Sequence, residues 1–214
     1  MGLITQALPA FFNGALITLE LTVAGIIIGL VLGVIIALCR ISQKPVLSNI
    51  ARFYVWFFRG SPLMLQIMFI YFALPMISSI SIDMLPAGII ALGLNAGAYL
   101  AEIIRAAIQS IDKGQMEASR ALGMNYAQAM RHVIIPQSYR RLIPPIGNEF
   151  VGLLKDSSLV SVMGLTELMR TTTVLSNSSG KAIYYLPCMI FYLALTTIFT
   201  VIFSRLEKKY SAYE

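Results

Sequence analysis

Long apolar stretches separated by short polar segments dominate the chain. A helix needs about 20 mainly apolar residues to cross the hydrocarbon core of a bilayer. One candidate stretch, residues 142–165, is apolar but is interrupted by Glu149, Lys155 and Asp156. Four other stretches meet the length requirement readily: residues 16–38, residues 63–80 or a longer stretch that starts near Val55, residues 85–104 and residues 184–203. The pattern therefore predicts an all-α membrane protein with four clear spans and one that needs further support.

The basic residues between the stretches indicate that residues 142–165 also cross the membrane. Most of the 16 basic residues lie after the first stretch (Arg40, Lys44, Arg52, Arg59), after the third (Arg105, Lys113, Arg120, Arg131, Arg140, Arg141) and in the tail (Arg205, Lys208, Lys209). With five spans, all three groups lie on one side, which the excess of Lys and Arg assigns to the cytoplasm. We therefore expect five transmembrane helices, with the N-terminus outside and the C-terminus inside.

Composition supports a membrane protein and excludes several other classes. The 214 residues are 57% hydrophobic and only 12% charged, whereas about a quarter of an ordinary soluble domain is charged. The net charge of +6 does not indicate nucleic-acid binding, because the basic residues lie in loops between spans. Cys39 and Cys188 lie in apolar surroundings and indicate no disulfide framework. His132 is the only histidine, so no His-based metal site is expected.

The long loop between the third and fourth spans has strong helix signals. Residues 115–122 are rich in helix formers, and Gly123 follows where a helix end favours positive φ. Asn125 is a credible N-cap for a second short helix over residues 126–135, which we expect Pro136 to end. From these residues alone, the helix pair either lies on lipid headgroups or forms a rigid projection that contacts a partner.

This loop resembles the EAA loop of ABC importer permeases. That family's pattern is Glu-Ala-Ala, three residues, Gly, nine residues, Ile, any residue and Leu-Pro. The chain has Glu117-Ala118-Ser119, Gly123 and Val133-Ile134-Ile135-Pro136 at these spacings. Ser119, Val133 and Ile135 are conservative departures. The resemblance covers residues 14–205, which we expect to form one transmembrane domain, with the coupling loop at residues 115–136.

Further matches, in chain order, point to the polar amino-acid branch of these permeases. They are Phe58-Arg59-Gly60-Ser61-Pro62, Asn95-Ala96-Gly97-Ala98-Tyr99-Leu100-Ala101-Glu102, Gly147-Asn148-Glu149-Phe150 and Lys155-Asp156-Ser157-Ser158-Leu159-Val160. The resemblance implies a bacterial inner-membrane subunit surrounded by lipid. It also implies a second identical or similar permease chain, two ATP-binding subunits and an extracytoplasmic solute-binding protein.

The resemblance further implies that the coupling loop contacts the ATP-binding subunit, through Glu117, Ala118, Ser119, Leu122 and Gly123. The chain has no GxxxxGK[ST] phosphate loop, since residues 179–182 lack both the upstream glycine and the final Ser or Thr. We therefore expect no enzymatic activity and no cofactor in this chain. ATP would be bound and hydrolysed by the partner subunit.

Ionisable groups within spans are costly and are therefore candidates for function. Glu149 and Asp156 are seven residues apart, close to two helical turns, so they share one face about 10 Å apart. Lys155 points away from that face. Asn95 and Tyr99 form a second polar stripe in the third span. We hypothesise that these four polar residues, Glu149, Asp156, Asn95 and Tyr99, line a passage for an amino acid. The alternative is a buried polar network that holds helices together.

Other polar residues in the spans favour structural interpretations. Glu20 lies near the outer end of the first span, where it can reach the headgroups. Glu102 and Arg105 are three residues apart and can form an ion pair. Met68 and Tyr71 are more typical of core packing than of a substrate passage.

The leading interpretation is therefore a permease subunit that forms the path for polar amino acids, with basic ones favoured by the acidic residues. Glutamine stays open, because every amino acid carries an α-ammonium group. The alternative is an ion-coupled secondary amino-acid transporter, although no inverted repeat of that class is evident. A channel or structural anchor would leave the acidic residues and the long loop unexplained.

Overall fold

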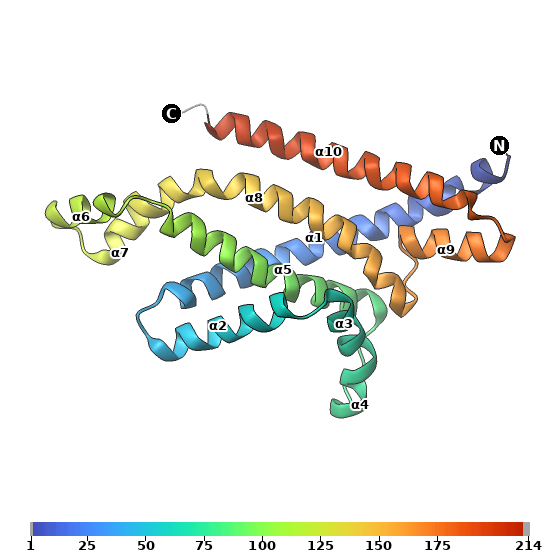
Figure 1. The fold of residues 1–214 in the computed structure, drawn as a ribbon, viewed down its shortest axis with the longest axis horizontal. Coiled ribbons are helices and arrows are strands. Elements are labelled where there is room, and N and C mark those ends of the chain that lie inside the picture. Colours follow the sequence, from blue (N-terminus) through green and yellow to red (C-terminus); the bar gives the residue numbers. More distant parts are fainter. Residues whose placement is uncertain (1, 212–214) are drawn as a thin grey trace.

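The computed structural model describes residues 2–211, whose regular elements are all helices and which contain no strand. Figure 1 shows α1 (Gly2–Ile41) crossing the whole molecule, with α5 (Met84–Gln109) and α8 (Ile135–Asp156) running beside it. The last helix, α10 (Tyr185–Ser211), covers the outside of this group. The prediction of an all-α fold is confirmed for the described residues.

Shorter elements occupy the two ends of the group. At one end lie α6 (Lys113–Ala121), α7 (Tyr126–Ala129) and the π-helical segment η2 (Met130–Ile134). The opposite end holds the 3-10 segments η3 (Ser157–Met163) and η4 (Ala182–Tyr184), with α9 (Leu168–Ser179) between them.

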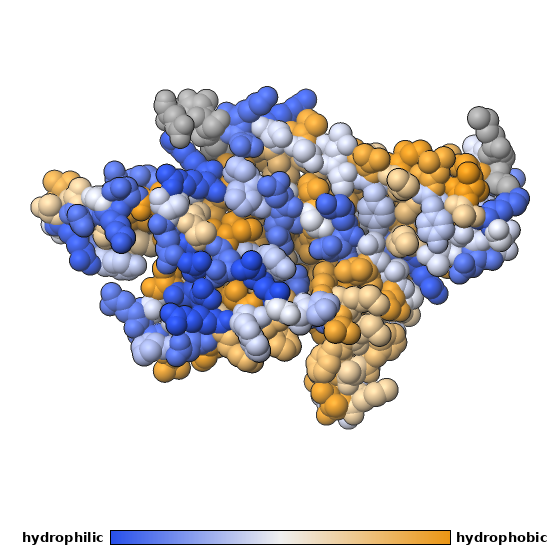
Figure 2. Space-filling model, in the orientation of Figure 1, coloured by the Kyte–Doolittle hydropathy of each residue, from blue (hydrophilic) through white to orange (hydrophobic). Residues whose placement is uncertain are grey.

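The second predicted span is bent rather than straight. Helix α2 (Pro45–Gly60) runs beside α1, and the chain then turns by 103° at Ser61 and Pro62. The following helices, α3 (Leu63–Met68) and α4 (Leu74–Ser78), are joined by the π-helical segment η1 (Phe69–Ala73). Together α3, η1 and α4 form an arm that projects from the molecule (Figure 1). Its surface is apolar (Figure 2).

Three helices, α1, α5 and α10, are long and apolar enough to cross a membrane. The bent pair formed by α2 and the arm gives a fourth candidate if it is counted as one span. Helix α8 is not among these candidates, and it carries five charged residues: Arg140, Arg141, Glu149, Lys155 and Asp156. The fold is therefore that of a membrane protein, and a total of five spans stays a prediction.

Pro136 does not end the second helix of the loop, contrary to the expectation from sequence. Helical backbone continues from α7 through η2 into α8, with Pro136 in the first turn of α8. A proline ring inside a helix normally clashes with the carbonyl four residues earlier. The wider π turn of η2 lies immediately before Pro136, where it relieves this clash. The same arrangement recurs in the arm, where η1 precedes Pro75.

The closest helix packing in the core is between α1 and α5. A Cβ atom added at Gly29 would lie 2.8 Å from the Cβ of Ala96, and one at Gly33 would lie 2.8 Å from the Cβ of Leu100. One at Gly93 of α5 would lie 2.7 Å from the side chain of Ile28. Small residues at four-residue spacing allow this close approach of membrane helices. The pair forms the rigid centre on which the other helices pack.

Candidate functional site

The loop between α5 and α8 has the turn predicted from its sequence. Asp112 caps α6 by accepting a hydrogen bond from the backbone N–H of Gly114 at 2.7 Å. Gly123 has a φ of 83°, in the left-handed region that favours glycine. Asn125 caps α7, because its side chain accepts the N–H of Gln128 while the Gln128 side chain accepts the N–H of Asn125. The loop is therefore an ordered projection.

Four of the five residues expected to contact a partner are exposed on this projection. Glu117, Ala118 and Gly123 are exposed, and Leu122 has 80% of its surface accessible. Ser119 is instead buried, and its hydroxyl donates to the backbone carbonyl of Gln115 at 2.6 Å. Ser119 therefore stabilises α6 from within and does not present its side chain to a partner.

Two contacts fix the projection to the start of α8. The Gln137 side chain donates to that of Gln115 at 3.0 Å, and the guanidinium of Arg141 donates to the carbonyl of Ser110 at 2.6 Å. Because both contacts join α8 to the loop that precedes it, movement of the loop and movement of α8 are physically coupled.

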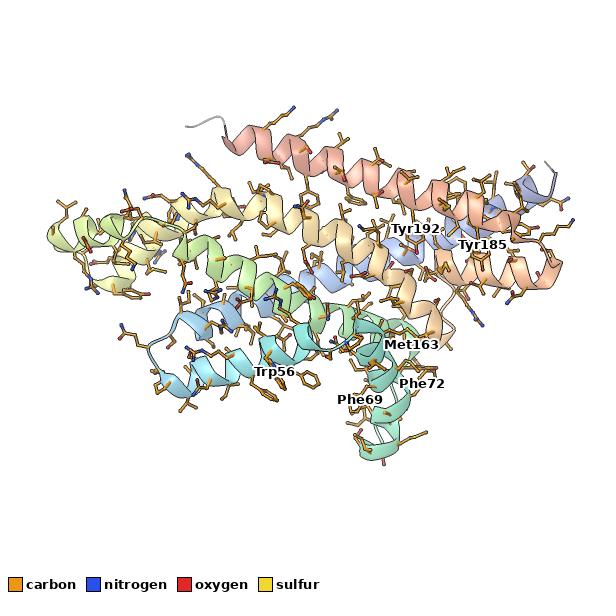
Figure 3. The ribbon with its side chains drawn as sticks, viewed as in Figure 1. Trp56, Phe69, Phe72, Met163, Tyr185 and Tyr192 are labelled. Carbon is orange, nitrogen blue, oxygen red and sulfur yellow. The ribbon has the colours of Figure 1, made fainter. Side chains whose placement is uncertain are left out.

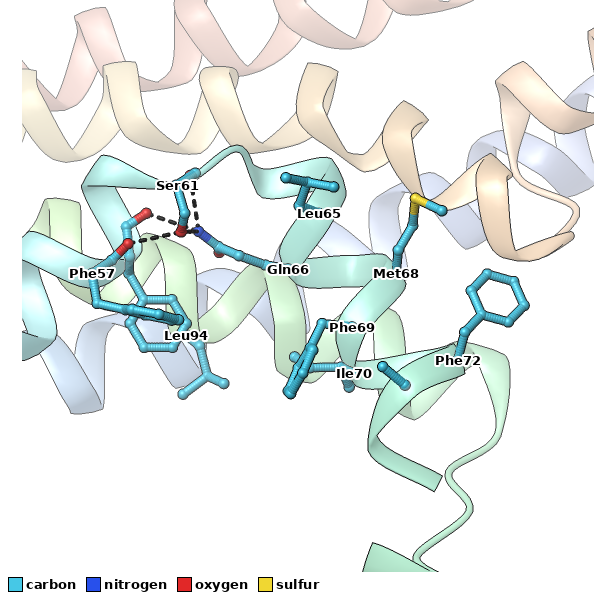
Figure 4. A pocket seen from close by; sticks show the side chains of 11 residues that line it. Phe57, Ser61, Leu65, Gln66, Met68, Phe69, Ile70, Phe72 and Leu94 are labelled. Atoms are coloured by element: carbon cyan, nitrogen blue, oxygen red, sulfur yellow. Dashed lines mark hydrogen bonds between the residues drawn. The ribbon is translucent and has the colours of Figure 1, made fainter. Parts of the chain in front are cut away.

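The structure places Asn95 within a buried hydrogen-bond network at the bend between α2 and α3. The amide of Asn95 donates to the Gln66 side chain at 3.0 Å and to the carbonyl of Phe58 at 3.2 Å. The Gln66 amide lies 2.9 Å from the Ser61 hydroxyl (Figure 4) and 2.9 Å from the carbonyl of Phe58. These bonds use carbonyls freed where α2 ends. The contacts favour the alternative, structural interpretation of Asn95.

The inner side of this bend is hollow. An open cavity of about 650 Å³ is lined mainly by apolar side chains, including Phe57, Leu65, Phe69 and Leu94 (Figure 4). Trp56 on α2 and Phe69 and Phe72 on the arm are exposed (Figure 3). Large apolar side chains therefore surround the bend.

Tyr99 lies one turn further along α5 and contacts Arg59. The guanidinium carbon of Arg59 is 5.0 Å from the centre of the Tyr99 ring, which is a cation–π distance. From the sequence, Arg59 indicated orientation and belonged to a family match, but its contact with Tyr99 was not predicted. The two carboxylates on α8 differ in their surroundings, because Glu149 is partly buried and Asp156, the last residue of α8, is exposed.

The predicted pairing of Glu102 and Arg105 is confirmed, and α1 adds a third member. The guanidinium of Arg105 is 2.8 Å from the Glu102 carboxylate, and that of Arg40 is 3.2 Å from it. This ion cluster joins α1 to α5 near the end of the molecule that carries the loop.

Sequence analysis missed a buried carboxylate at the opposite end. Glu167 caps α9, and its carboxylate accepts the N–H groups of Met169 at 2.8 Å and Arg170 at 2.7 Å. The Tyr192 hydroxyl of α10 also donates to it at 3.0 Å (Figure 3). Glu167 is fully buried, and burial raises its pKa although these hydrogen bonds partly oppose the rise. The available sequence signal was that a negative charge is favourable at a helix N-terminus.

Comparisons with known proteins identify what this arrangement resembles. Residues 25–212 match the family described as "Binding-protein-dependent transport system inner membrane component". The arginine transport system permease protein ArtQ of Bacillus subtilis is 42% identical over 207 residues, covering 94% of this chain and 93% of ArtQ. The glutamine transport system permease protein GlnP of Escherichia coli K12 is 37% identical over 208 residues, covering 96% and 95%.

Two solved structures have the same fold. A crystal structure of an amino acid ABC transporter with histidines aligns with a TM-score of 0.91 and 38% identity, over 96% of each chain. An inward-facing methionine ABC transporter, MetNI, aligns with a TM-score of 0.74 over 98% of each chain. At 20% identity, the second likeness concerns the fold alone.

Proposed function

The chain belongs to the family of binding-protein-dependent transport system inner membrane components, and we propose that it carries a basic amino acid through a five-span bundle. It is a permease subunit of an amino-acid ATP-binding cassette importer, a multi-pass inner-membrane protein and not an enzyme, because its relatives are such permeases over nearly their full length. ATP hydrolysis is carried out by a separate subunit.

The proposed five spans are α1, the bent pair of α2 and the arm, α5, α8 and α10. The 22 residues of α8 extend about 33 Å at 1.5 Å per residue, enough to cross the hydrocarbon core. The turn after α1, the loop with α6 and α7, and the end of α10 all lie toward one end of the molecule (Figure 1). These are the segments that carry most basic residues, which supports a cytoplasmic position for that end.

The exposed projection supports docking to ATP-binding subunits, one for each of two permease chains. Glu117, Ala118, Leu122 and Gly123 lie at its surface, and Ser119 holds α6 from within. We propose that ATP is bound only by those subunits. An extracytoplasmic solute-binding protein would deliver the amino acid at the opposite end, beside α9.

The apolar arm supports a contact with a second permease chain, identical or similar to this one. The arm leaves the helix group at a steep angle (Figures 1 and 2), and its outer helix α4 has no buried residue. Phe69, Phe72 and Met76 are exposed on it. An apolar patch of this kind is typical of a protein interface, and the cavity inside the bend would receive side chains from the second chain.

Glu149 and Asp156 are the residues of α8 that we propose to line the passage. A partly buried carboxylate at Glu149 would attract the α-ammonium or cationic side chain of an amino acid, and exposed Asp156 would do so nearer the outer end. Tyr99 lies beside Arg59 on the same path. Asn95 contributes by holding the bend, through its bonds to Gln66 and Phe58.

The near full-length similarity to an arginine permease, together with the partly buried carboxylate of Glu149, carries this proposal. Glutamine permeases are almost as similar, so uptake of the two amino acids separates the alternatives. The assembled transporter, reconstituted in vesicles, should take up labelled arginine faster than labelled glutamine.

The role of Glu149 is tested by Glu149→Gln. We expect a loss of arginine uptake of about tenfold or more, since a charged contact contributes roughly 1.5–3 kcal/mol. Assembly and ATP hydrolysis should persist. Glu20→Gln, which removes an exposed carboxylate from α1, is the matched control and should leave uptake unchanged. Normal arginine uptake by Glu149→Gln would refute the proposed role.

A further inference from the structure

A second cavity, of about 630 Å³, lies between the end of α1 and the loop projection. One part of its wall is apolar and includes Leu38, Ile41 and Ile135. Another part is polar and includes Lys44, Arg120 and the ring of Tyr126. The cavity therefore combines an apolar portion and a cationic portion, which is the combination that an amphipathic ligand requires.

Within residues 2–211, the two cations of this cavity form no ion pair. Among residues 2–211, the carboxylate that forms ion pairs with Arg40 and Arg105 is that of Glu102. Neither Lys44 nor Arg120 has a carboxylate oxygen within 4 Å in this described part, and both are exposed. Two cations in the wall of one cavity, without acidic partners in the described residues, attract an anion.

An exposed apolar stripe on α1 leads into the same cavity. Val31, Ile35 and Leu38 follow one another at four- and three-residue spacing, so they share a helix face. Their exposed fractions are 58%, 51% and 51%. Leu38 belongs both to this stripe and to the cavity wall. The stripe therefore runs along a membrane helix and ends beside Lys44 and Arg120.

We propose that this cavity binds an anionic phospholipid of the cytoplasmic leaflet. Its phosphate contacts Lys44 and Arg120, and an acyl chain lies along Val31, Ile35 and Leu38. Basic pockets at the cytoplasmic ends of membrane helices are suited to such headgroups. The assignment to the cytoplasmic leaflet rests on the orientation given under the proposed function. A soluble subunit could reach the cations, but it could not cover a stripe that lies within the bilayer.

The bound lipid would connect two parts of the permease. Ile41 is the last residue of α1 and Lys44 caps the start of α2, whereas Arg120 and Tyr126 belong to the projection. A phosphate held between these parts stabilises one arrangement of the projection relative to α1. The lipid therefore acts as a structural ligand at the base of the coupling loop.

Native mass spectrometry of the assembled transporter, extracted from equimolar phosphatidylglycerol and phosphatidylethanolamine vesicles, measures this binding. We expect one retained phosphatidylglycerol per copy of this chain. The double variant Lys44→Gln with Arg120→Gln should reduce the preference for phosphatidylglycerol by about 30-fold, because it removes two cations that each attract an anionic headgroup. The control, Arg52→Gln with Arg131→Gln, removes two exposed cations that do not line the cavity. It should retain the preference.

Phosphatidylglycerol with a photoreactive acyl chain provides a second measurement. Labelling should concentrate in residues 31–44 and at Ile135 and should decrease in the Lys44/Arg120 double variant. Equal labelling of all exposed apolar helices, or equal retention of the two lipids, would overturn the proposal. Displacement of the labelled lipid by inorganic phosphate would also overturn it. The same holds if the ATP-binding subunit covers the cavity and no lipid is retained. Arginine uptake in the same vesicles reports separately on the proposed function.

Discussion

Gly29 provides the most direct test of the packing between α1 and α5. In Gly29→Ala, the new methyl carbon would lie 2.8 Å from the Cβ of Ala96 and 3.2 Å from the backbone nitrogen of Gly97. Carbon atoms in favourable contact are about 3.5–4.0 Å apart. Both neighbours are rigidly attached to α5, so the helices must separate by about 1 Å. Overpacking of this kind costs about 1–3 kcal/mol.

Gly152→Ala is the matched control for this substitution. A Cβ atom at Gly152 of α8 would meet no other atom within 4 Å. Both variants add one methyl group to a helix and gain the same helix propensity, up to about 1 kcal/mol over glycine. The difference between them therefore isolates the packing cost, which we expect to be about 1–3 kcal/mol.

The free energy of unfolding is measured by titrating the purified protein in mild detergent with a denaturing detergent and following its circular dichroism. Gly29→Ala should unfold at a lower denaturant fraction than Gly152→Ala. Equal stability of the two variants would show that α1 and α5 can separate freely, and the close-packed centre would then be wrong.

Three further predictions concern the bend, the loop and the buried carboxylate. Gln66→Leu removes an acceptor of the buried Asn95 amide and should lower the free energy of unfolding by about 1–3 kcal/mol. Replacing Asn95 by Leu as well should recover part of this loss. Additive losses in the double variant would argue against a shared network. Gly123→Ala places a side chain at a φ of 83° and should lower the local stability of the turn by about 1–2 kcal/mol. Amide hydrogen exchange should become faster in α6 and α7 only. Unchanged exchange there would contradict a strained turn. Burial raises the pKa of Glu167, so the folded protein holds that proton more tightly than the unfolded chain. Its contribution to stability is therefore full below the unfolded pKa of about 4.3 and is lost as pH rises through the higher folded pKa. Melting temperatures between pH 4 and 8 should consequently fall more steeply with pH for the native protein than for Glu167→Gln, and parallel curves would rule this linkage out.

The long elements were predictable because their signals are local. The apolar stretches at residues 16–38, 85–104 and 184–203 lie within α1, α5 and α10, apart from Tyr184, which is the last residue of η4. Each helix extends past the stretch at one end or both, since polar residues at membrane surfaces remain helical. Gly123 and Asn125 were also predictable, because a left-handed turn and an N-cap each restrict the choice of residue.

The bend after α2 was not predicted, although one signal was present. Ser61 precedes a proline and has extended backbone angles, φ −115° and ψ 146°, as residues before proline commonly do. Apolar residues on both sides of the bend nevertheless read as one continuous span. The direction of a bend is set by tertiary contacts, here the buried bonds from Gln66 and Asn95, which a single sequence does not display.

The candidate site was predictable in its loop and less so in its membrane part. Exposed residues of the projection follow a family pattern, whereas the surroundings of Glu149, Asp156 and Asn95 depend on which helices pack together. Residues 142–165 also form two kinds of helix, since α8 ends at Asp156 and η3 follows. Periodicity alone carries no information about such a change. Glu167 was missed because it lies in a connection that looks polar and exposed.

The unbroken helix that leads from α7 through η2 into α8 has a mechanical consequence. No loop lies between Tyr126, the first residue of α7, and Glu149, within the proposed passage. A push or twist on α7 cannot be absorbed by a flexible joint and must tilt or rotate α8. A conformational change of the ATP-binding subunit would thus change the direction in which the carboxylate of Glu149 faces.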